Sequence, residues 1–102
     1  MFWLNLPSSP LRIAVDSNGR HLELRNQSSG AVTGYQLGCV TEESGKIKVQ
    51  RRFELLEMKN ELAAGWFTVD DFKYRDLCKE KKAKLAVLSV SFADGSQWMI
   101  KQ

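Results

Sequence analysis

The sequence predicts an all-β domain in which two antiparallel sheets, with about seven strands between them, pack face to face. Short segments of alternating apolar and polar residues recur along the chain, turn residues separate them, and each end of the chain forms a hairpin with a consistent register. The predicted strands lie near residues 11–16, 20–26, 31–40, 46–54, 66–70, 85–92 and 96–101.

The composition fits one domain. The chain has 102 residues, of which 43% are hydrophobic and 26% charged, as is usual for a single folded core. Pro7 and Pro10 fix φ and disfavour helix before them, so residues 1–10 are expected to be an N-terminal tail and residues 11–102 the domain. No apolar run approaches the ~20 residues that cross a bilayer. Residues 1–6 lack the basic start and length of an export signal.

The first hairpin is predicted from Asn18-Gly19, between residues 11–16 and 20–26. Both central residues of a type I′ turn need positive φ, which Asn and Gly tolerate best. A two-residue loop then pairs Ser17 with Arg20. The same register sets apolar residues of the two strands opposite each other: Val15 with Leu22, and Ile13 with Leu24.

The third strand carries Gly34 and Gly38 on one side, which predicts a bulge or a close approach of another backbone. The fourth strand places Arg51 on its apolar side.

Residues 54–64 contain good helix formers and are followed by Gly65, a typical helix C-cap, so the alternative is an α+β fold with one short helix near 54–64. A strand continuing to Leu56 fits equally well.

The closing hairpin is predicted from Ala93-Asp94-Gly95, a three-residue turn that ends in a glycine able to take positive φ. Pairing Phe92 with Ser96 sets Val90 opposite Trp98. It also sets Leu88 opposite Ile100, which predicts one apolar face along the hairpin.

Strand number, strand spacing and the closing Val90-Ser91-Phe92-Ala93-Asp94-Gly95-Ser96-Gln97-Trp98 hairpin resemble the immunoglobulin-like and fibronectin-type-III-like sandwich domains of secreted and cell-surface proteins. The resemblance covers residues 11–101. It implies an immunoglobulin-like β-sandwich that acts as a non-catalytic interaction or accessory module. Antibody-type domains carry a tryptophan in the third strand between two paired cysteines. Here Tyr35 stands in that strand and Cys39 follows it, a departure from that subfamily.

Cys39 and Cys78 leave two interpretations open. A disulfide would close a loop of about forty residues, stabilise the fold by roughly 4 kcal/mol and imply an oxidising compartment. Alternatively, both are unpaired thiols, with Cys39 buried and Cys78 exposed.

The sequence offers little for catalysis or metal binding. His21 is the only histidine, and a blue-copper site needs two. His21 alternates with Leu22 and is expected on the surface, so we expect no metal, no cofactor and no enzyme. A small hydrolase, the least favoured alternative, would need His21 in a concave pocket beside a nucleophile. The net charge of +3 is spread over mixed stretches such as Lys79-Glu80-Lys81-Lys82, which does not indicate nucleic-acid binding.

Aromatic and basic residues in and after the fifth strand form the candidate binding surface. A protein or carbohydrate partner could use such a platform, made of Trp66, Phe72, Lys73, Tyr74 and Arg75. Alternatively, Phe67 and Val69 belong to the core and Trp66 covers a sheet edge. We therefore expect an extracytoplasmic interaction or accessory module with an unidentified partner. The alternative is a cytosolic structural or regulatory protein, with reduced cysteines, that forms a homodimer through its edge strands.

Overall fold

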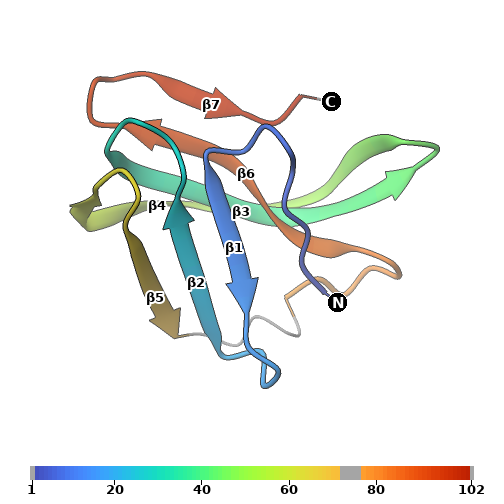
Figure 1. Cartoon of the computed structure of the whole chain (residues 1–102). Helices are drawn as coiled ribbons and strands as arrows, with labels where there is room; N and C mark the ends of the chain where they lie inside the picture. The colour runs from blue at the N-terminus through green and yellow to red at the C-terminus, as the bar shows by residue number, and fades with distance from the viewer. Residues whose placement is uncertain (1, 72–76, 102) are drawn as a thin grey trace.

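The computed structural model describes residues 2–71 and 77–101, and these form two antiparallel sheets (Figure 1). One sheet has the strand order β1-β2-β5 and the other the order β4-β3-β6-β7. The strands are β1 (Leu11–Val15), β2 (His21–Asn26), β3 (Val32–Glu43), β4 (Lys46–Leu62), β5 (Phe67–Asp71), β6 (Lys84–Phe92) and β7 (Gln97–Met99). The predicted all-β architecture of two sheets and seven strands is confirmed.

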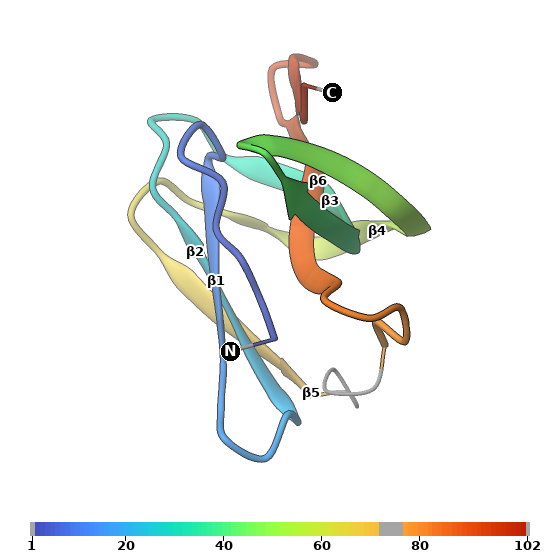
Figure 2. The ribbon, with the colours of Figure 1, turned by 90° about the vertical axis from the view of Figure 1, so that its right-hand side faces the viewer.

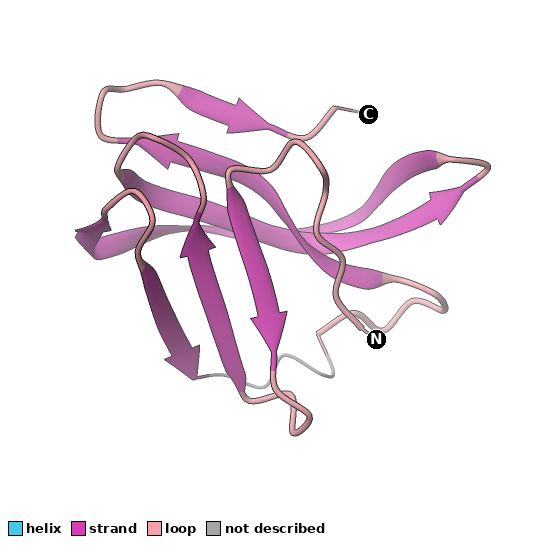
Figure 3. Cartoon of the chain, in the orientation of Figure 1, coloured by secondary structure: helices cyan, strands magenta, loops and turns pink. Residues whose placement is uncertain are grey.

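Residues 54–64 contain no helix, so the α+β alternative is wrong (Figure 3). β4 runs on to Leu62 and pairs with β3 along its length. Its side chains are mostly exposed, and helix propensity is a weak preference that tertiary pairing overrides. The register shifts between Val32 and Gly34, where β4 advances from Leu62 to Glu57. This bulge leaves several residues of β4 without a partner in β3, and the strand continues beyond them to Leu62. Within the described residues, the chain has no helix of the length and apolar character that a bilayer span requires.

The β1–β2 hairpin has the predicted strand register and a different turn. Ile13 pairs with Leu24 and Val15 with Leu22, as expected. Of the two residues Asn18 and Gly19, only Gly19 takes positive φ, at 71°. The amide of Asp16 donates to the carbonyl of His21 over 3.1 Å. The loop therefore spans Ser17 to Arg20 and is not a type I′ turn. The Asp16 carboxylate accepts the amides of Arg20 and His21, which stabilises this longer loop.

The two glycines of β3 allow neighbouring atoms to approach closely, as predicted. A Cβ at Gly38 would overlap the side chain of Leu88 and the carbonyl of Arg51, and one at Gly34 would lie 3.0 Å from the carbonyl of Leu56. Register shifts adjoin both positions. The glycines thus permit β3 to bend between β4 and β6.

The closing hairpin has the predicted register. Val90 pairs with Trp98, the amide of Phe92 donates to the carbonyl of Ser96, and the amide of Ile100 donates to the carbonyl of Leu88. The prediction of one shared apolar face is wrong. β3 pairs with Ser89 and then with Val87, so Leu88 is bulged and belongs to a different apolar cluster from Val90.

The main core lies between the two sheets (Figure 2). Inward side chains of both sheets fill it, namely Leu11, Ile13, Val15, Leu22, Leu24, Val32, Tyr35, Leu37, Leu62, Leu85, Val87 and Val90. A second cluster consists of Val40, Ala86 and Leu88, with Leu4, Ile47, Val49 and Ile100 packed against it.

The segment predicted as an N-terminal tail makes contacts with the domain. The amide of Leu4 donates to the carbonyl of Leu85, and the amide of Leu85 donates to the carbonyl of Phe2. The Asn5 side chain bonds both the amide and the carbonyl of Ile13. Residues 2–5 therefore lie along the edges of β6 and β1.

Candidate functional site

Of the five residues in the predicted binding surface, the structure describes Trp66. The other four, Phe72, Lys73, Tyr74 and Arg75, lie outside the described residues. The Trp66 side chain is 68% exposed, and its position directly before β5 leaves it on the surface. The structure thus places Trp66 as an exposed aromatic and does not describe the other four.

Trp66 lines a groove of about 550 Å³ between β4 and β5. These two strands are consecutive in the chain and belong to different sheets (Figure 1). The groove is therefore lined by residues of both sheets. Its lining comes from both strands and from the core beneath, namely Leu24, Tyr35, Leu56, Glu57, Met58, Lys59, Asn60, Glu61, Leu62, Trp66, Phe67, Thr68, Val69 and Asp70.

The groove has a buried apolar floor and an exposed apolar rim. Leu24, Tyr35 and Leu62 are buried core residues. Burial, and to a smaller extent the negative charge of Asp70, raise the pKa of the Tyr35 hydroxyl to about 12, so it stays neutral at ordinary pH. On the rim, Phe67 is 53% and Val69 51% exposed. Large side chains left in water around a concavity are typical of interaction surfaces.

The charged residues of the groove are mainly acidic. Glu57, Glu61 and Asp70 line it, against the single basic residue Lys59. This local excess is opposite in sign to the net charge of +3 on the whole chain. A positively charged ligand would therefore meet a favourable potential at the groove.

Buried Asn26 holds the end of the groove in place. Its side-chain amide donates to the carbonyl of Leu62 over 2.9 Å and to the carbonyl of Gly30 over 2.8 Å. Its backbone accepts the amide of Gly65 and donates to the carbonyl of Trp66. Asn26 thus ties the end of β4 to the start of β5. Sequence reasoning missed this role, although Asn26 follows Leu22 and Leu24 at the same inward-facing parity.

A second, smaller hollow of about 370 Å³ lies over the outer face of the β1-β2-β5 sheet. Two of its charged residues already interact with each other: Arg25 bonds Glu23 over 3.0 Å. The Arg25 guanidinium also lies 4.9 Å from the centre of the Phe67 ring. The groove between β4 and β5 is larger and more apolar along its rim, and is the better candidate site.

His21 is exposed, as predicted, and both of its ring nitrogens face carboxylates. Nδ1 lies 2.6 Å from Oδ2 of Asp16, and Nε2 lies 3.2 Å from Oδ1 of Asp71. The hydrogen bond to Asp16 raises the pKa of His21 and lowers the pKa of Asp16 to about 2. His21 lines neither of the two hollows described above. In the described part of the chain, no three metal-ligating side chains gather into a site.

We expect the pKa of His21 to lie above 6.5 in the folded protein. Because folding raises this pKa, the stabilisation is complete below about 6.5 and is lost as the pH rises through the folded-state pKa. Because folding lowers the pKa of Asp16, its contribution is present above about pH 4 and is lost as the pH falls through about 2. NMR titration of the single histidine measures the first shift.

Asp16→Asn should lower the His21 pKa more than Asp71→Asn does, because the hydrogen bond that His21 donates to Asp16 is the largest cause of the shift. Asp94→Asn, in the opposite hairpin, should leave it unchanged. A His21 pKa at or below 6.5 in the unmodified chain would contradict the geometry.

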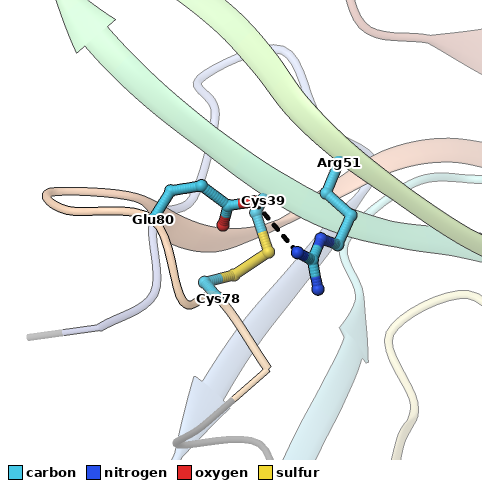
Figure 4. The surroundings of a disulfide bond; sticks show 4 residues. All are labelled: Cys39, Arg51, Cys78 and Glu80. Carbon is cyan, nitrogen blue, oxygen red and sulfur yellow. Dashed lines mark ion pairs between the residues drawn. A yellow bond between two sulfur atoms is a disulfide. The ribbon is translucent and has the colours of Figure 1, made fainter.

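Cys39 and Cys78 form a disulfide, the first of the two interpretations that the sequence left open, with their Cα atoms 5.5 Å apart (Figure 4). Cys39 is in β3, and Cys78 lies in the segment before β6. Beside the bond, Nη2 of Arg51 lies 3.2 Å from Oε1 of Glu80 (Figure 4). This ion pair accounts for Arg51 on the apolar side of β4. Both contacts hold the segment before β6 against β3 and β4.

No family model matches the chain, and neither a curated protein nor a solved structure matches it.

Proposed function

We propose that this protein is a non-catalytic, extracytoplasmic interaction module that binds a protein partner through the groove between β4 and β5. The observation that carries the proposal is the exposed apolar rim around a concave site with a buried floor. Tryptophan and other aromatic residues supply much of the binding energy in protein interfaces. Trp66 and Phe67 are such residues, and more than half of each side chain is exposed to solvent.

A protein partner is favoured over a carbohydrate by the aliphatic share of the lining. Leu56, Met58 and Val69 accompany the aromatic residues, and aliphatic side chains gain most from burial against other apolar side chains.

The two-sheet architecture also supports the proposed likeness to immunoglobulin-like and fibronectin-type-III-like modules. The Cys39–Cys78 disulfide supports an extracytoplasmic location, because such bonds persist in oxidising compartments.

Selection from a displayed library of random peptides tests the proposal. We expect selected peptides to bind the intact chain and to lose at least about tenfold in affinity with Trp66→Ala, because truncation removes a central aromatic contact. Met99→Ala is the matched control: Met99 is 57% exposed on β7, away from the groove, and this variant should bind within about twofold of the unmodified chain.

Two outcomes would overturn the proposal. One is a selection in which no peptide depends on Trp66. The other is a glycan array in which sugars bind in a Trp66-dependent manner while peptides do not. Circular dichroism and thermal unfolding of both variants verify that they remain folded.

A further inference from the structure

The fold protects most of its strand edges from pairing with another chain. β7 leaves the start of β6 unpaired, and there Leu85 is bonded to residues 2 and 4. The free edge of β1 is bonded by the Asn5 side chain. β7 has only three residues. β4 carries many lysines and arginines and has three register shifts. Short length, basic residues and bulges are established ways to keep an edge strand from pairing.

β5 differs from these strands. It is the last strand of the order β1-β2-β5, and within the described residues no strand pairs with its other edge. It has no lysine, arginine, proline or bulge, and its two charged residues, Asp70 and Asp71, stand at its end. Phe67 and Val69 are half exposed on it. A regular edge with apolar side chains is a template for an additional strand.

The hydrogen bonds between β2 and β5 show which residues of β5 direct their backbone groups toward the open edge. The amide of Asn26 donates to the carbonyl of Trp66, so Trp66 directs its carbonyl toward β2. In an antiparallel pair, alternate residues direct their amide and carbonyl groups toward the partner. Thr68 therefore faces β2, whereas Phe67 and Val69 present theirs to the open edge.

The two faces of β5 offer different surroundings to the side chains of an added strand. Phe67 and Val69 line the rim of the groove along the edge of β5. They belong to the outer face of the sheet, because they pair with Arg25 and Glu23 and Arg25 stacks on Phe67. The other face borders the groove, whose lining includes Glu57, Glu61 and Asp70. An added strand would thus place alternate side chains beside apolar residues and beside acidic ones.

We propose that an extended, basic segment of the partner protein adds to the free edge of β5, with alternate side chains that are apolar on the outer face and basic toward the groove. The inference rests on the proposed function and adds the conformation and charge of the partner. A second copy of this chain fits less well. It would bring another acidic rim to the interface, and like charges oppose association.

The probes are three peptides of about ten residues, long enough to span β5: a Val-Lys repeat, a Val-Glu repeat and a Val-Gln repeat. We expect the Val-Lys peptide to bind about tenfold or more tightly than the Val-Glu peptide at low ionic strength, and the difference to shrink with added salt. In NMR hydrogen exchange, this peptide should slow the amides of Phe67 and Val69 by about tenfold or more, because they acquire acceptors. The amide of Thr68 already faces β2 and should change little.

The variant Glu57→Lys/Glu61→Lys should abolish the preference for the Val-Lys peptide. Glu54→Lys is the matched control, since Glu54 is exposed on β4 and outside the groove lining, and it should keep most of the preference. Trp66→Ala should weaken all peptides that bind.

The results separate the two proposals. If library peptides bind through Trp66 but the Val-Lys peptide does not bind, or binds without slowing the Phe67 and Val69 amides, strand addition is wrong and the proposed function stands. Equal affinity for the Val-Lys and Val-Glu peptides overturns the proposed charge of the partner. Concentration-dependent dimerisation that protects the same amides without any peptide assigns the edge to a second copy. If no peptide depends on Trp66, both proposals fail.

Discussion

Val90→Asp is expected to destabilise the protein severely and to shift its unfolding to a much lower urea concentration. Val90 is completely buried in β6, where it pairs with Tyr35 of β3 and Trp98 of β7. A carboxylate there would lose its hydration without gaining a partner, at a cost of about 4 kcal/mol or more. A domain of this size has a free energy of unfolding of about 5–15 kcal/mol. Urea unfolding followed by circular dichroism measures the loss.

Val69→Asp is the matched control, because it makes the same substitution at a half-exposed position on β5. Its effect on the free energy of unfolding should stay within about 1 kcal/mol. Unfolding of Val90→Asp at the same urea concentration as the unmodified chain would contradict the buried position of Val90 and the register of the closing hairpin.

The second large effect is expected from removal of the disulfide. In Cys39→Ala/Cys78→Ala the free energy of unfolding should fall by about 3–4 kcal/mol, because the unfolded chain regains the freedom of a loop whose ends are 39 residues apart. Alanine is chosen because Cys39 is fully buried and a serine hydroxyl would need a partner. Urea unfolding under non-reducing conditions measures the change.

Reduction of the unmodified chain with dithiothreitol supplies the control. It should produce a similar loss, and it should leave the double variant unchanged. Mass spectrometry after thiol alkylation tests the location at the same time. Two free thiols in protein isolated under non-reducing conditions would favour the cytosolic alternative and remove one support of the proposed extracytoplasmic function.

The candidate site could be predicted from the sequence only in part. Trp66 was recognisable as an aromatic beside a strand. Its partners in the groove were not, because Tyr35 comes from β3 and Glu57 from β4, and both reach Trp66 only through the packing of the two sheets. Asn26 was predicted only as the last residue of the second strand. Its bond to Leu62, 36 positions away, depends on where β4 ends, which the local sequence does not specify.

The local patterns determined the strands and the registers of the two terminal hairpins. Val15 opposite Leu22 and Val90 opposite Trp98 follow from alternation and from short turns, whose geometry depends on neighbouring residues alone. The Asn18-Gly19 turn shows the limit of such patterns, because the Asp16 carboxylate stabilised a longer loop. The register of β1 against β2 is nevertheless the predicted one, because burial of one face of the hairpin fixes the register independently of the turn.

Only the tertiary structure decided the continuation of β4 through residues 54–62, the placement of residues 2–5 along strand edges, and the open edge of β5. Each depends on contacts between residues far apart in the chain, so the same local sequence suits more than one outcome. Residues 54–64 suit a helix in isolation, and residues 54–62 form a strand because they pair with the backbone of β3. The amino-acid sequence thus determined which segments can be strands, and packing between the sheets decided which edges remain available to a partner.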